Sequence, residues 1–274
     1  KQTAKPSHSR SSSQASRPRR KKRRNTRLWV PQYHGAWAMV TIPPLVGVIE
    51  GGFRLIEVLV FALWFVGYFL FYSATVWLKS RCKKRYFPPV RLYGLIVVVL
   101  GLASMVSAPY LWRWALVFSP LVAVAAWEAW KRDERSLISG LDTIVAACLM
   151  IPVMFDIAGN GAPSFAASPR AWLLTALFFG YFAGTLFYVK TNIRERGSNL
   201  YLAASILWHA SWTVAAGVLA VRQEVSWIHV AVWLAIATRA VVIPLLGRAG
   251  KSVGVKVIGF GELFTCIAFV LTVF

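Results

Sequence analysis

Long runs of apolar residues, separated by short polar stretches, make up most of the chain after its first 27 residues. About 20 apolar residues span the hydrocarbon core of a bilayer as a helix. Nine runs come close to or exceed this length, and they cover residues 35–52, 55–78, 91–108, 110–130, 137–157, 170–190, 199–221, 226–247 and 254–273. The pattern predicts an all-α fold, a polytopic membrane bundle of about nine transmembrane helices. The break between the third and fourth runs rests on the turn-like sequence Ser107-Ala-Pro109.

The composition supports a membrane protein and excludes several other classes. Apolar residues account for 57% of the chain and charged residues for 15%, whereas soluble domains are about one quarter charged. This composition excludes a soluble enzyme. The continuous apolar runs exclude a porin, whose strands alternate apolar and polar residues.

The basic residues indicate the orientation in the membrane. If the N-terminus is inside, 27 of the 31 Lys and Arg residues fall in the tail and the loops of the inner side. The outer side then holds only Arg54, Arg113, Arg170 and Arg222. Because basic residues collect in cytoplasmic loops, the N-terminus is expected inside and the C-terminus outside.

The first 27 residues differ from the rest and divide the chain into two parts. They contain 11 basic residues, no acidic residue and no aromatic residue. We expect 1–27 to be a disordered, basic cytoplasmic tail and 28–274 to be a nine-helix transmembrane domain. The tail is expected to contact the anionic membrane surface. Nucleic acid is disfavoured as a partner, because no aromatic residue stands among the charges for base stacking.

Ionisable residues within the apolar runs mark candidate functional positions, because each one is costly in hydrocarbon without a partner or a cavity. His34, Asp142, His209, Arg239 and Glu262 all fall in the cytoplasmic half or near the midplane. We expect them to line one inward-facing polar cavity. His209 can also be a purely structural hydrogen-bonding residue, and Arg239 and Glu262 a purely structural ion pair.

Helical spacing places further polar residues on shared faces. On the seventh run Ser205, His209 and Thr213 follow each other at intervals of four residues. On the sixth run Tyr181, Thr185 and Tyr188 share one face, because they are four and three residues apart. Gly180 and Gly184 of that run form a GxxxG step that would allow a close helix–helix approach.

The loop 190–199 is the most polar stretch between two predicted helices. Ser198 or Asn199 would cap the helix that follows, and Arg194 and Arg196 stand beside its positive end. This arrangement favours binding of a phosphate or a carboxylate, with Glu195 as a partner of the arginines. Ordinary positive-inside charge explains the same residues equally well. The predicted ligand-binding residues are His34, Trp37, Asp142, Tyr188, Asn192, Arg194, Glu195, Arg196, His209, Arg239 and Glu262.

Catalytic and metal-binding motifs are missing from the sequence. There is no Walker loop, HExxH, GxSxG or zinc-type Cys/His spacing. Cys82, Cys148 and Cys266 are scattered and are expected to be inert. No metal site and no cofactor is predicted, and the catalytic residues, if any exist, cannot be named from the sequence.

Several short stretches resemble the YwiC-like family of bacterial membrane proteins. They are Gln32-Tyr-His-Gly-Ala-Trp-Ala-Met39 followed by Pro43-Pro44, Asn192-Ile-Arg-Glu-Arg196, and Gly261-Glu262. The resemblance spans residues 30–274. It implies a multi-pass protein of the bacterial cell membrane from a family whose activity is uncharacterised.

The layout of nine helices is also similar to that of the UbiA-type prenyltransferases. Those enzymes hold magnesium and a prenyl diphosphate with Asp-rich motifs after their second and sixth helices. The corresponding stretches here are 72–81, which has no acidic residue, and 192–199, which has only Glu195. One carboxylate between two arginines cannot hold a magnesium pair. If the protein is an enzyme, the sequence therefore favours a metal-independent membrane transferase.

The sequence leaves three functional hypotheses open. The first is a protein that binds an anionic lipid or a prenyl-phosphate-like ligand in the cytoplasm-facing cavity. The second is a small-molecule or ion transporter in which the same buried charges form the path. The third is a structural or assembly partner.

Overall fold

The computed structural model describes residues 28–31, 35–133, 136–161, 168–251 and 253–274. Helices form almost all of this part of the chain, so the predicted all-α fold is confirmed. The predicted tail, 1–27, lies outside the described residues. His34 of the HGAW stretch also lies outside them.

Each predicted apolar run corresponds to one helical span in the described part of the chain. The helices are α1 (Ala36–Gly51), α2 (Leu55–Lys79), α3 (Phe87–Ser107), α4 (Trp112–Lys131), α5 (Leu137–Cys148), α6 (Met150–Ala158), α8 (Pro169–Ile193), α9 (Asn199–Val221), α10 (Trp227–Arg248) and α11 (Val255–Val273), with short 3₁₀ turns η2 (Lys84–Tyr86) and η3 (Pro109–Leu111). Helices α5 and α6 are separated only by Leu149 and form one span of 22 residues. Eight spans have the length and apolar composition to cross a membrane, and α1 is shorter with 16 residues.

The predicted turn between the third and fourth runs is present. A residue that precedes proline is disfavoured in the helical region, and Ala108 has φ −145° and ψ 81°. Pro109 then opens η3, after which α4 begins at Trp112. The local sequence alone therefore accounts for this break.

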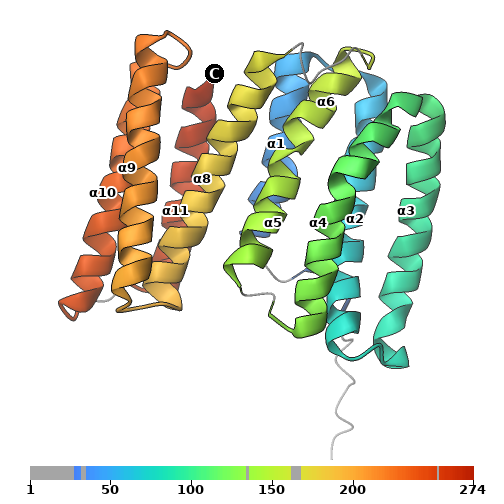
Figure 1. Cartoon of the computed structure of the whole chain (residues 1–274), viewed down its shortest axis with the longest axis horizontal. Helices are drawn as coiled ribbons and strands as arrows, with labels where there is room; N and C mark the ends of the chain where they lie inside the picture. Colours follow the sequence, from blue (N-terminus) through green and yellow to red (C-terminus); the bar gives the residue numbers. More distant parts are fainter. Residues whose placement is uncertain (1–27, 32–34, 134–135, 162–167, 252) are drawn as a thin grey trace, which may run out of the picture.

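Successive spans run in opposite directions across the bundle (Figure 1). The C-terminal end of α11 lies at the end of the bundle where α1 also finishes, which agrees with an odd number of crossings in the described chain (Figure 1). Helices α1 to α6 form one half and α8 to α11 the other. Helix α8 joins the halves, because it packs against α1, α5 and α6 as well as α9, α10 and α11.

The outer surface of the bundle carries many large apolar side chains. On α3, for example, Leu95, Val98, Leu102 and Val106 are each more than half exposed. A soluble protein rarely leaves so large an apolar surface in water, whereas lipid chains solvate it readily. Together with the helix lengths, this surface identifies an integral, multi-pass membrane protein.

The GxxxG step on α8 is a close contact with α9. A Cβ added at Gly180 would lie 2.3 Å from the ring of Trp212, and one at Gly184 would lie 2.9 Å from Nε2 of His209. The indole N–H of Trp208 also donates to the carbonyl of Gly180 at 2.9 Å. Glycine is required at both positions because no larger residue leaves room for these rings.

Reporters at two positions in the chain should lie on opposite sides of the membrane. A reporter fused after Phe274 is expected to face the outer compartment, and one inserted between Lys79 and Arg91 the inner compartment. The reason is that 27 basic residues are expected on the inner side, and basic residues collect in cytoplasmic loops. Alkaline phosphatase and green fluorescent protein fusions measure the two locations, and two fusions on the same side would contradict nine crossings.

Candidate functional site

A buried polar cluster lies between α8, α10 and α11. The predicted pair forms here: Nη1 of Arg239 is 2.8 Å from Oε1 of Glu262. The hydroxyl of Thr185 donates to Oε2 of Glu262 at 2.9 Å, and Nη1 of Arg239 donates to the hydroxyl of Thr265 at 3.1 Å. The ring of Tyr188 covers the guanidinium, with 4.4 Å from the ring centre to the central carbon. The cluster therefore holds both charges within the membrane-spanning part of the protein.

Tyr181 completes the face of α8 that the sequence predicts. Its hydroxyl lies 3.3 Å from the carbonyl of Glu262 and 3.3 Å from the hydroxyl of Thr265. Tyr181, Thr185 and Tyr188 thus all contact the Arg239–Glu262 pair or its immediate neighbours. The polar face of α8 therefore lies against the charged residues of α10 and α11.

His209 of α9 lies beside this cluster and is buried, with 1% of its surface exposed. Its Nδ1 is 2.6 Å from the carbonyl oxygen of Ser205. A carbonyl only accepts, so Nδ1 carries the hydrogen and Nε2 is left as an acceptor. Nε2 of His209 faces Gly184 of α8, where an added Cβ would lie 2.9 Å from it, and the next residue, Thr185, bonds Glu262.

Several buried polar atoms of this region have no hydrogen-bond partner in the described chain. They are Nε and Nη2 of Arg239, Nε2 of His209 and Oγ of Ser205. Oε1 of Glu262 contacts the guanidinium without the alignment of a hydrogen bond. An unpaired buried donor or acceptor costs about 1 to 3 kcal/mol. The region therefore has unused capacity for hydrogen bonding.

An apolar cavity of about 580 Å³ lies in the other half of the bundle. Its walls come from α1 to α6, and we call it the α1–α6 cavity. Trp64, Phe71, Trp114 and Phe118 are among its aromatic lining residues, and Asp142 is the one charged residue among the described residues that line it. Its volume falls within the range of about 300 to 1,000 Å³ that is typical of ligand sites.

The α1–α6 cavity is elongated along α2. Val60 and Leu78 both line it, and the rise of a helix over the 18 residues between them is about 27 Å. The hydrocarbon core of a bilayer is about 30 Å thick. The cavity therefore has the length of a hydrocarbon chain that crosses much of one membrane.

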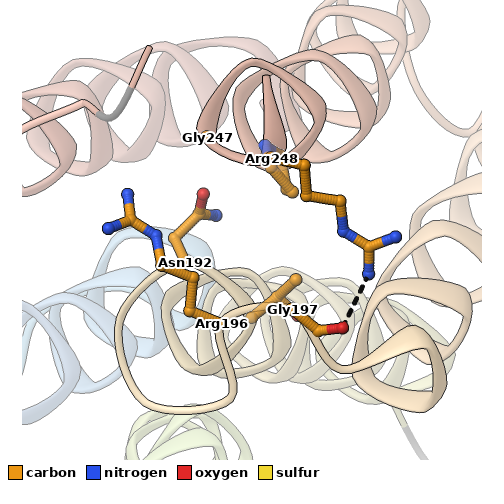
Figure 2. A pocket seen from close by; sticks show the side chains of 7 residues that line it. Asn192, Arg196, Gly197, Gly247 and Arg248 are labelled. Atoms are coloured by element: carbon orange, nitrogen blue, oxygen red, sulfur yellow. Dashed lines mark hydrogen bonds between the residues drawn. The ribbon is translucent and has the colours of Figure 1, made fainter. Parts of the chain in front are cut away.

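A small recess lies at the basic end of α8, α9 and α10. Its lining residues are Thr191, Asn192, Arg196, Gly197, Pro244, Gly247 and Arg248. Figure 2 shows Asn192 and Arg196 beside the recess and the guanidinium of Arg248 reaching the carbonyl of Gly197, at 3.3 Å. The recess measures about 10 Å³, which is about the room that one water molecule needs. An anion at this point would therefore lie on the surface between the two arginines.

The loop before α9 ends in the helix cap that the sequence predicts. The hydroxyl of Ser198 accepts from the backbone N–H of Tyr201 at 3.4 Å, so Ser198 caps α9. Arg194 is exposed and is not among the residues that line the recess, and the backbone N–H of Glu195 donates to the carbonyl of Lys190. Arg248 lines the recess together with Arg196, and the sequence does not predict this position.

A second ionic network, also missed from the sequence, lies at the other end of the bundle. Asp156 of α6 is buried and accepts from Nε of Arg113 at 3.2 Å and from the indole N–H of Trp114 at 2.8 Å. Nη2 of Arg113 forms an ion pair with the same carboxylate. Nearby, buried Glu57 accepts from the backbone N–H of Arg54 at 3.0 Å. The signal for this network in the sequence is Asp156, an acidic residue at the end of the fifth apolar run.

The predicted site residues thus lie at several places in the described chain rather than around one cavity. Tyr188, Arg239 and Glu262 meet in the polar cluster, with His209 beside them. Asn192 and Arg196 line the recess, and Asp142 lines the α1–α6 cavity. Trp37 packs against the rings of Phe65, Tyr68 and Phe69, and His34 lies outside the described residues. No group of three or more His, Cys, Asp or Glu residues in the described chain is placed to hold a metal ion.

Comparison with known proteins finds a matching family and similar uncharacterised proteins. Residues 30–155 match the family described as YwiC-like protein. The chain is 28% identical over 184 residues to the "Uncharacterized protein YwiC" of Bacillus subtilis, covering 66% of this chain and 73% of the relative. It is 25% identical over 188 residues to an "Uncharacterized protein" of Haemophilus influenzae, covering 67% and 75%. No solved structure matches the chain, and the UbiA-like layout stays a prediction. The resemblance to the YwiC-like family that the sequence indicates is therefore confirmed over residues 30–155.

Proposed function

We propose that the protein binds an anionic membrane lipid, such as a prenyl phosphate, with its hydrocarbon chain in the α1–α6 cavity. The observation that carries the proposal is the cavity itself, which is long, almost wholly apolar and about 580 Å³ in volume. Burial of a hydrocarbon chain against fixed apolar side chains gains packing contacts that fluid lipid supplies less well. An elongated apolar ligand suits this shape better than a compact polar one.

The head group is proposed to lie at the basic end of the cavity. Leu78 and Ala126 line that end, and the basic residues that follow them are those of the α2–α3 and α4–α5 loops. Arg81 stacks on Trp130, with 4.9 Å to the ring centre, and Lys131 lies 4.6 Å from the ring centre of Trp127. Tryptophan rings gather at the level of the lipid head groups. Arg81 and Lys131 are therefore well placed to pair with a lipid phosphate.

This location differs from the Arg194/Arg196 site that the sequence analysis favours. Arg194 and Arg196 stand on the loop after α8, whereas the cavity is enclosed by helices of the other half of the bundle. The two locations give different mutational results, so a single set of variants separates them.

Filling the cavity should expel the lipid. Gly67 lines the cavity, and a Cβ built there meets no atom within 4 Å, so Gly67→Phe places a ring in open space without backbone strain. We expect a loss of co-purifying lipid of about tenfold or more, equivalent to 1.4 kcal/mol or more of binding free energy. Purification in mild detergent followed by mass spectrometry of the bound lipids measures the loss.

Gly217→Phe is the matched control, because Gly217 is also an uncrowded helix glycine but belongs to α9 in the other half. Equal lipid retention in the two variants would contradict the proposal. Arg81→Gln with Lys131→Gln is expected to lower the anionic share of the bound lipid. If Arg194→Gln with Arg196→Gln lowers it instead, the head group lies on the loop after α8.

A further inference from the structure

Arg239 has one edge of its guanidinium unused. The group carries five N–H donors in a rigid fork. Its Nη1 is engaged by Glu262 and Thr265, whereas Nε and Nη2 are buried and have no hydrogen-bond partner. Nε and Nη2 form the edge whose two parallel N–H bonds match the two oxygens of a carboxylate. The free edge is therefore preorganised for a planar oxyanion.

Two buried side chains of α9 also carry polar atoms without a hydrogen-bond partner in the described chain. Nε2 of His209 and Oγ of Ser205 are both without a hydrogen-bond partner, and their residues are 1% and 0% exposed. The ring of Tyr188 stacks on the guanidinium and fixes its plane. A carboxylate that pairs with Nε and Nη2 of Arg239 recovers the cost of leaving these two donors unpaired in a place remote from water. Nε2 of His209 is an acceptor and does not pair with a carboxylate.

Charge balance limits which ligands can enter. Glu262 already neutralises Arg239, so a bound anion would leave one uncompensated negative charge within the membrane-spanning part of the protein. Such a charge is costly in hydrocarbon. One proton taken up together with the anion removes this cost.

We propose that the free edge of Arg239 binds a carboxylate and that Glu262 takes up one proton when the carboxylate binds. The balance is one anion and one proton added to a neutral ion pair, which gives a complex of unchanged net charge. The proton goes to Oε1 of Glu262, the oxygen without an aligned hydrogen bond, while Oε2 continues to accept from Thr185. This site is independent of the lipid cavity. It supplies a specific chemistry for the second functional hypothesis, a transporter: binding of one carboxylate together with one proton.

Several titratable and charged groups surround Glu262. They are Tyr181 and Tyr188 of α8, His209 of α9, Arg239 of α10 and Cys266 of α11. The tyrosines and the cysteine hold their protons at neutral pH, and arginine stays charged. Glu262 and His209 are the two groups of this set that remain as candidate proton acceptors, so the test must distinguish them.

Trifluoroacetate is a suitable probe, because it is a carboxylate that does not itself take up a proton near neutral pH. Its binding to the full chain in detergent is measured by fluorine NMR between pH 5 and 8. If one proton is taken up per anion, the affinity of the wild type falls by up to tenfold for each unit of rising pH. Binding with no dependence on pH, or no binding at any pH, would overturn the proposal without any variant.

Variants then identify the residues. Arg239→Lys keeps the charge but lacks the fork, and it should weaken binding by about tenfold or more, whereas Arg222→Lys, at an exposed position beyond α9, should leave binding unchanged. Glu262→Gln mimics the protonated residue and should bind the probe without a pH dependence. His209→Gln should keep the pH dependence. Loss of the dependence in His209→Gln but not in Glu262→Gln would overturn the assignment of the proton to Glu262.

Discussion

Asp156→Asn is expected to lower the free energy of unfolding by about 3 to 5 kcal/mol, the typical cost of breaking a buried ion pair by removing one partner. The side chain of Asp156 is fully buried, with 0% of its surface exposed. Its carboxylate receives both the guanidinium of Arg113 and the indole N–H of Trp114. Asparagine keeps the size and one acceptor, but it leaves the charge of Arg113 without its counterion.

The effect is measured by thermal unfolding in mild detergent. The control is Glu50→Gln, because Glu50 pairs with Arg170 at 3.5 Å and both side chains are partly exposed, at 21% and 31%. A pair of this kind contributes about 0 to 1 kcal/mol. Arg113→Gln combined with Asp156→Asn should recover part of the loss, since no uncompensated charge is left. Equal effects of Glu50→Gln and Asp156→Asn would show that burial of the Asp156 network carries no extra stability.

Glu262→Gln and Arg239→Gln are each expected to destabilise the protein, by about 3 kcal/mol or more, for the same reason. The two charges are 2.8 Å apart, and their side chains are only 14% and 15% exposed. Glu262→Gln leaves Arg239 with Thr265 and the ring of Tyr188 as its contacts. Arg239→Gln leaves a carboxylate supported by Thr185.

A double-mutant cycle tests whether the two residues act as a pair. The double variant should be more stable than the sum of the single effects predicts, because neither charge is then left alone. Thr238→Val serves as the control, since Thr238 is an exposed neighbour on α10 and its hydroxyl bonds only within its own helix. Strict additivity of the two single losses would contradict a coupled pair.

Some of the site could be predicted from the sequence because it depends on position along single helices. Residues at intervals of three or four share a face, so the common polar face of Tyr181, Thr185 and Tyr188 followed from their spacing. The capping of α9 by Ser198 is similarly local, since a cap bonds to a backbone N–H within three residues.

Contacts between residues far apart in the chain could not be predicted from the sequence. Arg113 and Asp156 are 43 residues apart, and nothing near either residue in the chain points to its partner. The meeting of Arg196 and Arg248 at one recess also joins residues far apart in the chain. The α1–α6 cavity also had no signal, because apolar residues that line a cavity and apolar residues that face lipid look alike in a sequence.

The sequence by itself determined the nine spans and the expected orientation of the chain, because transfer into a bilayer depends on each segment's own length, hydrophobicity and flanking charges. Only the tertiary structure decided which polar residues meet. That choice depends on which helices are neighbours and how each is rotated about its axis, and both follow from side-chain packing across the whole bundle, such as the fit of Trp212 and His209 against Gly180 and Gly184. Depth in the membrane predicted one cavity for Asp142, His209, Arg239 and Glu262. The structure instead places Asp142 in the apolar cavity and the other three in or beside the polar cluster. The reason is that depth fixes a residue's level in the membrane but not the direction in which its side chain points.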